Sequence, residues 1–162
     1  MMIDAWANFF IAQCGASAAL LGLLFVSVSL SLGKILAFPV LPGRALTAML
    51  LLLAVLLVSS FLLIPGQPIA AIGIEVLGVG FPLCGASAVI GIRGMRNSTP
   101  DHRREFVSSF VFLAVATLPY LAAGILFVAG GAAAPYCLAA AIILSYLKAF
   151  LDAWVLLIEI HR

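Results

Sequence analysis

Long apolar stretches alternate with short polar segments along the whole chain. Five of the stretches are long enough for a helix to cross the hydrocarbon core of a bilayer, which takes about 20 residues. The connecting segments LAFPVLPGR, PGQP and GGAAAP carry proline or glycine, which break or end helices. The pattern predicts an all-α protein in which residues 1–162 form a single transmembrane domain. We place its five spans at residues 6–32, 45–64, 69–92, 106–129 and 136–160.

A cleaved signal peptide is the alternative interpretation of the first apolar stretch. Such a signal carries Lys or Arg ahead of a short apolar core. MMIDAWANFF contains an aspartate instead, and the apolar run that follows is longer than a signal core. We therefore expect the first stretch to be a permanent span.

Composition and charge add an orientation to this picture. Apolar residues make up 65% of the chain and charged residues 9%, with a mean hydropathy of +1.30, far outside the range of soluble domains. Four arginines fall in RGMRNSTPDHRREF, and the positive-inside rule places this loop in the cytoplasm, together with Lys34, Arg44 and Arg162. We thus expect the N-terminus outside and the C-terminus in the cytoplasm. The net charge of +2 reflects this asymmetry and does not indicate nucleic-acid binding.

Residues that carry soluble-enzyme chemistry are not grouped in this sequence. Cys14, Cys84 and Cys137 lie within or at the edge of spans and form no CxxC or Cys/His group. His102 and His161 are too far apart in the chain to indicate a local metal site. The sequence also lacks a Walker loop, a dinucleotide fingerprint, GxSxG and HExxH. We expect no enzymatic activity and predict neither a cofactor nor a metal.

The pentapeptide CGASA occurs twice, at residues 14–18 and 84–88. A duplicated half would explain the repeat, but the two copies begin at different depths, about 12 and 22 Å into their helices. Small residues four apart let membrane helices approach closely, and this explanation is favoured over duplication. The pairs with this spacing are Gly15/Ala19, Ala18/Gly22, Gly80/Cys84 and Cys84/Ala88.

Ionisable residues line one face of the fifth span. Such groups are expensive in a bilayer, so they usually face protein or water. Within this span, Lys148 and Asp152 are four residues apart, a spacing at which opposite charges pair. Four polar residues of the span fall within an arc of about 60° on a helical wheel, namely Ser145, Lys148, Asp152 and Glu159.

Further polar residues occur in three other spans. The first span carries Gln13, Ser17, Ser27 and Ser31 at the spacing of a packed seam that could face the charged stripe. The third span adds Glu75. Pro82 in the third span and Pro119 in the fourth each remove a backbone hydrogen bond, which predicts a helix bend.

Two explanations of the intramembrane polarity remain open. In the first, the charges pair and lock helix register or a subunit interface. In the second, they line a hydrated path. Asp152, Glu75 and Glu159 outnumber the single intramembrane lysine, and this excess of carboxylates favours the path.

The leading functional hypothesis is a small channel or transporter for protons, cations or another small solute. In it, the carboxylates bind or relay charge, Lys148 acts as a tethered counter-ion, and the prolines supply bends for gating. The alternative is a non-catalytic membrane subunit that assembles with or regulates a larger complex. The expected partners are the lipid bilayer, further copies of the chain in a homo-oligomer, and in the alternative a membrane protein.

Two stretches carry a resemblance to a known group of proteins. GASAALLGLLFVSVSL and the terminal AWVLLIEI resemble small bacterial integral-membrane proteins of unknown function. The likeness covers the first and last spans. It implies a multi-pass protein of the bacterial inner membrane, and it brings no catalytic motif to any residue of this chain.

Overall fold

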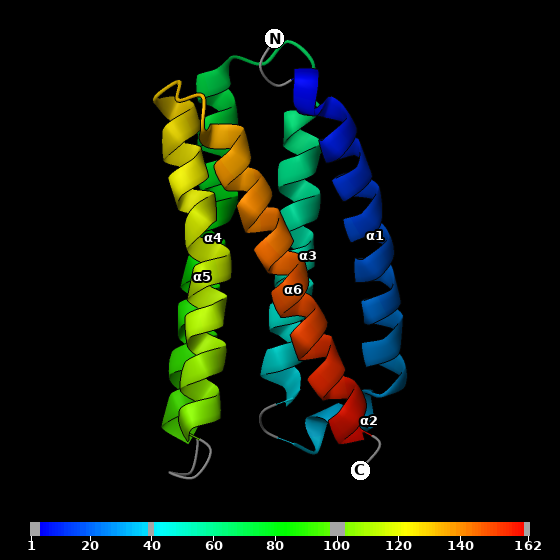
Figure 1. Ribbon diagram of the computed structural model, residues 1–162. Helices are drawn as coiled ribbons and strands as arrows, with labels where there is room; N and C mark the ends of the chain where they lie inside the picture. Colours follow the sequence, from blue (N-terminus) through cyan, green and yellow to red (C-terminus); the bar gives the residue numbers. More distant parts are fainter. Residues whose placement is uncertain (1–3, 39–40, 98–102, 161–162) are drawn as a thin grey trace.

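Long helices run side by side through most of the chain, as the computed structural model shows for residues 4–38, 41–97 and 103–160 (Figure 1). The part of the chain that the structure describes is all-helical, and five of its helices are long and apolar enough to cross a membrane. The predicted fold class is thereby confirmed. A short 3-10 helix, η1, precedes α1. The elements are η1 Asp4–Trp6, α1 Ala7–Leu30, α2 Leu32–Leu36, α3 Leu41–Leu62, α4 Ile69–Asn97, α5 Arg103–Val128 and α6 Ala134–Ile160.

The central helix of the bundle is α3, which packs against α1, α4 and α6. Helix α5 packs against α4 and α6, and α6 crosses the bundle diagonally (Figure 1). Helix α1 lies at the outside, and its two buried residues are Phe10 and Ser17. Helix α2 lies at one end of the bundle, which we call the α2 end, and we call the opposite end the Trp6 end.

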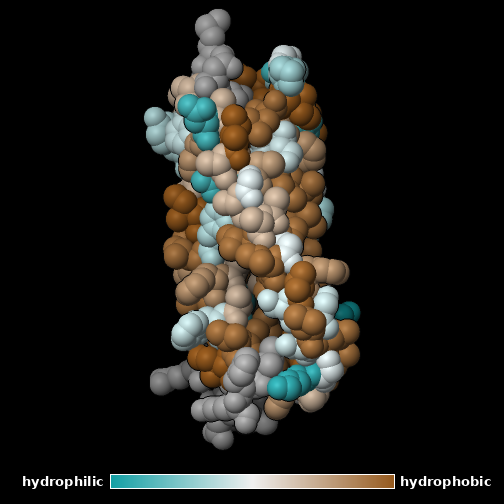
Figure 2. All heavy atoms as spheres, turned by 90° about the vertical axis from the view of Figure 1, so that its right-hand side faces the viewer, coloured by the Kyte–Doolittle hydropathy of each residue, from teal (hydrophilic) through white to brown (hydrophobic). Residues whose placement is uncertain are grey.

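The outer surface of the bundle is mostly apolar, as a surface in contact with lipid must be. Figure 2 views the molecule from its α1 side, where tan and brown side chains cover most of the surface. The deepest teal atoms lie in the upper and lower parts of this view. Large apolar side chains such as Leu23, Phe25 and Leu30 are 63–84% exposed here, as expected for residues whose solvent is the bilayer.

Helices α4 and α5 approach most closely at glycines. A Cβ on Gly73 would lie 2.7 Å from the Val128 backbone nitrogen and 2.8 Å from the Gly124 carbonyl oxygen. At Gly80, an added Cβ would lie 3.0 Å from Leu121. Of the pair Gly80/Cys84, Gly80 thus lies in a close helix contact, whereas Gly85 within the second CGASA copy has nothing within 4 Å of an added Cβ.

The exposed small residues of the first CGASA copy make no close helix contact within the described part of this chain. Gly15, Ala18, Ala19 and Gly22 are exposed, and an added Cβ on either glycine would meet nothing within 4 Å. Within this chain, the small residues of α1 thus face outwards.

The contact at Gly73 gives a stability prediction with a matched control. Gly73→Ala places a methyl group against backbone atoms of α5, which can shift only if the helix itself moves. We therefore expect it to lower the folding stability by about 1–3 kcal/mol. Gly78→Ala lies on the same helix in open space and should leave stability unchanged or slightly raised. Unfolding of both variants in detergent micelles measures the difference. Equal stability of the two variants would contradict the close helix contact.

Candidate functional site

The buried face of α6 carries the polar residues that the sequence placed on one stripe. Ser145, Lys148 and Asp152 recur every three to four residues, so they share the face that packs against the bundle. They are 0%, 4% and 1% exposed. The Lys148 ammonium donates a hydrogen bond to Oδ2 of Asp152, which is the pairing expected at this spacing.

A third charged side chain, Arg44, joins this pair from α3. Its Nη1 lies 3.6 Å from Oδ1 of Asp152, and its side chain is 23% exposed. The prolines and glycine of LAFPVLPGR predict a loop at Arg44, which is wrong, because α3 begins at Leu41 and includes it. Pro42 does not prevent this because the first turn of a helix needs no backbone donor there. We call Arg44, Lys148 and Asp152 the charged cluster.

The charged cluster leaves one acceptor unused. Oδ1 of Asp152 is buried without a hydrogen-bond partner among the described residues, since 3.6 Å to Arg44 is an ion pair and too long for a hydrogen bond. A buried acceptor in this condition costs free energy unless something donates to it. The arrangement can therefore take one further hydrogen-bond donor at this oxygen.

Hydroxyl groups continue the polar residues from the cluster towards the middle of the bundle. The hydroxyls of Tyr120 on α5 and Ser145 on α6 are hydrogen bonded at 3.0 Å, and both residues are fully buried. Ser145 lies one helical turn from Lys148. Tyr120, Ser145, Lys148, Asp152 and Arg44 thus form a polar chain that runs from the bundle interior to the half-buried Arg44 at the α2 end.

Apolar side chains make up most of the bundle interior between this polar chain and the Trp6 end, where Ser59 of α3 is also buried. They belong to four helices, and each has no exposed surface. This group, which we call the apolar plug, belongs to the main hydrophobic core. The polar chain is consequently closed towards the Trp6 end. The plug residues are Val58, Val76, Phe127, Leu138 and Ile142.

Glu75 lies apart from the charged cluster. It is in the second turn of α4, near the Trp6 end, whereas Asp152 lies roughly three helical turns deeper along α6. Its Oε1 accepts a hydrogen bond of 2.9 Å from the Gln67 amide, and its Oε2 is buried with no hydrogen-bond partner among the residues that the structure describes. The structure does not bring the two carboxylates together.

The polar residues of α1 bond mainly to backbone. Ser17 is buried and its hydroxyl donates to the Cys14 carbonyl at 3.1 Å, while the Gln13 carbonyl accepts from the Tyr146 hydroxyl at 3.1 Å. Ser27 is exposed and donates to a carbonyl of its own helix, and Ser31 ends that helix. These four residues therefore form no continuous polar surface facing the charged cluster.

The remaining predicted residues are the two prolines and Glu159. Pro82 and Pro119 lie inside α4 and α5, which both continue through them. The Pro119 carbonyl accepts a hydrogen bond of 3.5 Å from the Cys137 thiol. The side chain of Glu159, like His102 and His161, lies outside the described residues. Across the described ranges, no three His, Cys, Asp or Glu side chains group as metal ligands would.

Fold and site together define a class of protein. The chain is a multi-pass integral membrane protein whose helix bundle holds a charged cluster and a short polar chain in its interior. No protein-family model matches the chain, and neither a curated protein nor a solved structure does.

Proposed function

We propose that this protein is a small channel or transporter in which the polar chain from Tyr120 to Arg44 forms part of a proton or small-solute path. One observation carries the proposal. Asp152 is held between two cationic side chains in the interior of an apolar bundle, and within the described part of the chain one of its oxygens has no hydrogen-bond donor. Ionisable residues inside membrane bundles pair with one another and mark ion and proton pathways, so an incompletely bonded carboxylate in this position supports a path.

The charges around Asp152 favour some solutes over others. Lys148 and Arg44 both repel a metal cation that approaches the carboxylate, and such an ion would have to displace one of them. A neutral solute that donates a hydrogen bond would satisfy Oδ1 without displacing either cation. The two cations also oppose protonation of Asp152, but a proton, unlike a metal ion, needs no coordination space beside them. Protons and hydrogen-bonding solutes are therefore the preferred cargo.

The apolar plug separates the polar chain from the Trp6 end, so passage requires the plug to open. Pro82 and Pro119 are the bend points that we assign to this movement, since proline weakens the helix backbone where it occurs. In this proposal the protein lies in a bacterial inner membrane with the α2 end in the cytoplasm. No catalytic step is part of it.

Proton flux into liposomes that contain the purified protein tests this function. Asp152→Asn keeps the size of the side chain but removes its charge, so we expect flux to fall at least tenfold, equivalent to about 1.4 kcal/mol on the barrier. The flux is followed with a pH-sensitive dye trapped inside the liposomes under an imposed potential.

Glu75→Gln is the matched control, because it makes the same change at an intramembrane carboxylate outside the polar chain. It should retain most of the flux. Wild-type protein that conducts no better than empty liposomes, for protons and for small hydrogen-bonding solutes, contradicts the proposal.

A second candidate function is a non-catalytic membrane subunit. The outward-facing small residues of α1 favour it, since Gly15 and Gly22 have open space around them in this chain and would let another helix approach closely. A homo-oligomer would use the same face. Co-purification from native membranes with one dominant partner, without flux by the isolated protein, would favour this candidate.

A further inference from the structure

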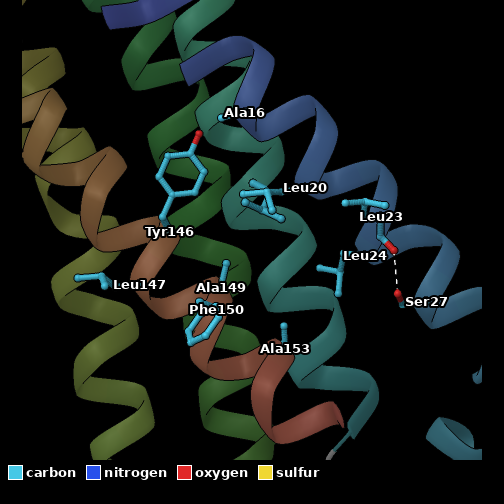
Figure 3. A pocket seen from close by; sticks show the side chains of 11 residues that line it. Ala16, Leu20, Leu23, Leu24, Ser27, Tyr146, Leu147, Ala149, Phe150 and Ala153 are labelled. Carbon is cyan, nitrogen blue, oxygen red and sulfur yellow. Dashed lines mark hydrogen bonds between the residues drawn. The ribbon is translucent and has the colours of Figure 1, made fainter. Parts of the chain in front are cut away.

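An apolar groove runs along the outside of the bundle between α1 and α6, with α3 behind it (Figure 3). Its volume is about 580 Å³. Leu20 and Leu24 point into it from α1, and Phe150 and Ala153 line it from α6. Leu52 contributes from α3. The groove thus has two helical walls and a helical floor.

The two hydroxyl groups of the groove are already satisfied within the protein. Ser27 donates to the Leu23 carbonyl at 2.9 Å, which Figure 3 shows as a dashed line, and Tyr146 donates to the Gln13 carbonyl at 3.1 Å. Neither hydroxyl of the lining therefore needs a polar ligand as a hydrogen-bond partner. A hydrocarbon chain is the occupant that this surface fits.

The position of the groove matches one leaflet of a bilayer. From Ala16 to Ser27 the groove extends about 16 Å along α1, and half of a hydrocarbon core is about 15 Å thick. Leu23 and Phe150 are 68% and 66% exposed, so the groove is open to the surrounding lipid. It lies in the half of the bundle nearer to α2.

Basic residues near the groove favour an anionic phospholipid over a neutral one. The bilayer is as apolar as the groove, so burial of a hydrocarbon chain alone gives no preference. Just beyond the groove, however, α2 carries the exposed Lys34, and the half-buried Arg44 lies at the same end of the bundle. We propose that the groove holds an acyl chain of an anionic phospholipid whose phosphate lies beside Lys34.

Photo-crosslinking of the unaltered full chain tests this proposal. The protein is reconstituted in phosphatidylcholine vesicles that contain a small fraction of phosphatidylglycerol with a diazirine in its acyl chain, and the crosslinked peptides are mapped by mass spectrometry. We expect crosslinks to concentrate on the groove segments of α1 and α6, several-fold above the equally exposed Phe81 on α4 and Leu118 on α5.

The headgroup preference is tested by comparing phosphatidylglycerol with phosphatidylcholine. The same diazirine chain on phosphatidylcholine should label the groove about fivefold less, because one basic side chain near an anionic headgroup contributes about 1 kcal/mol. Lys34→Gln should reduce this difference while the groove labelling itself remains. Because Lys34 is exposed, this variant removes its charge without opening a cavity in the bundle.

Filling the groove is the complementary test. Ala16→Leu with Ala153→Leu narrows it from both walls and should reduce groove labelling at least tenfold, whereas Ala122→Leu on the exposed face of α5 should not. Equal crosslinking of all exposed faces would overturn the proposal, since it describes ordinary surrounding lipid. Crosslinking between two protein copies through the groove would overturn it too, in favour of a second copy as the occupant.

Discussion

Asp152→Leu is expected to lower the free energy of unfolding by about 3–5 kcal/mol, the largest stability effect in this chain. The substitution leaves the Lys148 ammonium buried without its hydrogen-bonded counter-charge and removes the partner of Arg44. A buried charge that has lost its partner costs far more than the pair contributes. Unfolding in mixed detergent micelles, followed by circular dichroism, measures the loss.

The double variant Lys148→Met with Asp152→Leu isolates the charge effect. Replacement of a whole buried ion pair by apolar residues is often neutral, so we expect most of the lost stability to return. Arg44 then reaches solvent or headgroups, since its side chain is already 23% exposed. A double variant as unstable as Asp152→Leu alone would show that the loss came from packing and not from charge.

Ile142→Ser is expected to increase proton leak through liposome-reconstituted protein at least tenfold. Ile142 is fully buried in the apolar plug and lies one helical turn from Ser145, the point where the polar chain begins on α6. A hydroxyl at this position weakens the dry constriction and extends the polar chain towards the Trp6 end. Apolar constrictions gate by excluding water, so a polar group there favours conduction.

Ile143→Ser is the matched control for the plug variant. It makes the same change at the next position, where the side chain is 53% exposed on the outside of the bundle. The leak should then stay at the wild-type level. If Ile142→Ser and Ile143→Ser leak equally, the leak comes from a general loss of helix packing. The apolar plug then does not control conduction.

Much of the fold follows from the sequence for simple physical reasons. A bilayer requires helices of about 20 apolar residues, so the lengths of the apolar stretches predict five spans. The pairing of Lys148 with Asp152 also follows from sequence, because residues four apart lie above one another on a helix.

Arg44 shows where the prediction failed. Two prolines and a glycine before it suggested a loop, but Pro42 occupies the first turn of α3, which tolerates proline. The helix therefore starts early enough to carry Arg44 to Asp152. A proline shortly before a long apolar stretch, here three residues ahead of Ala45, is a helix-start signal, and it could have indicated this position.

The packing partners could not be predicted. The polar seam on α1 indicates the buried side at Ser17 but not at Ser27, which is exposed. The small residues of α1 face outwards, whereas Gly73 and Gly80 of α4 are packed, and spacing alone does not separate the two cases. Glu75 pairs with Gln67 in the preceding loop, a contact that helical spacing does not reveal. Side-chain contacts between elements depend on helix order and rotation, which a single sequence does not contain.

Water access to Ser145 distinguishes a hydrated path from a dry ion pair. In a background without Cys14, Cys84 and Cys137, single cysteines at Ser145 and at the exposed Leu151 are challenged in native membranes with a small charged thiol reagent. A hydrated path predicts labelling at position 145 and none at position 151, which faces lipid. If position 145 remains unlabelled in folded protein, water does not reach the polar chain. The charged cluster then only holds α3 against α6, and the proposed path is contradicted.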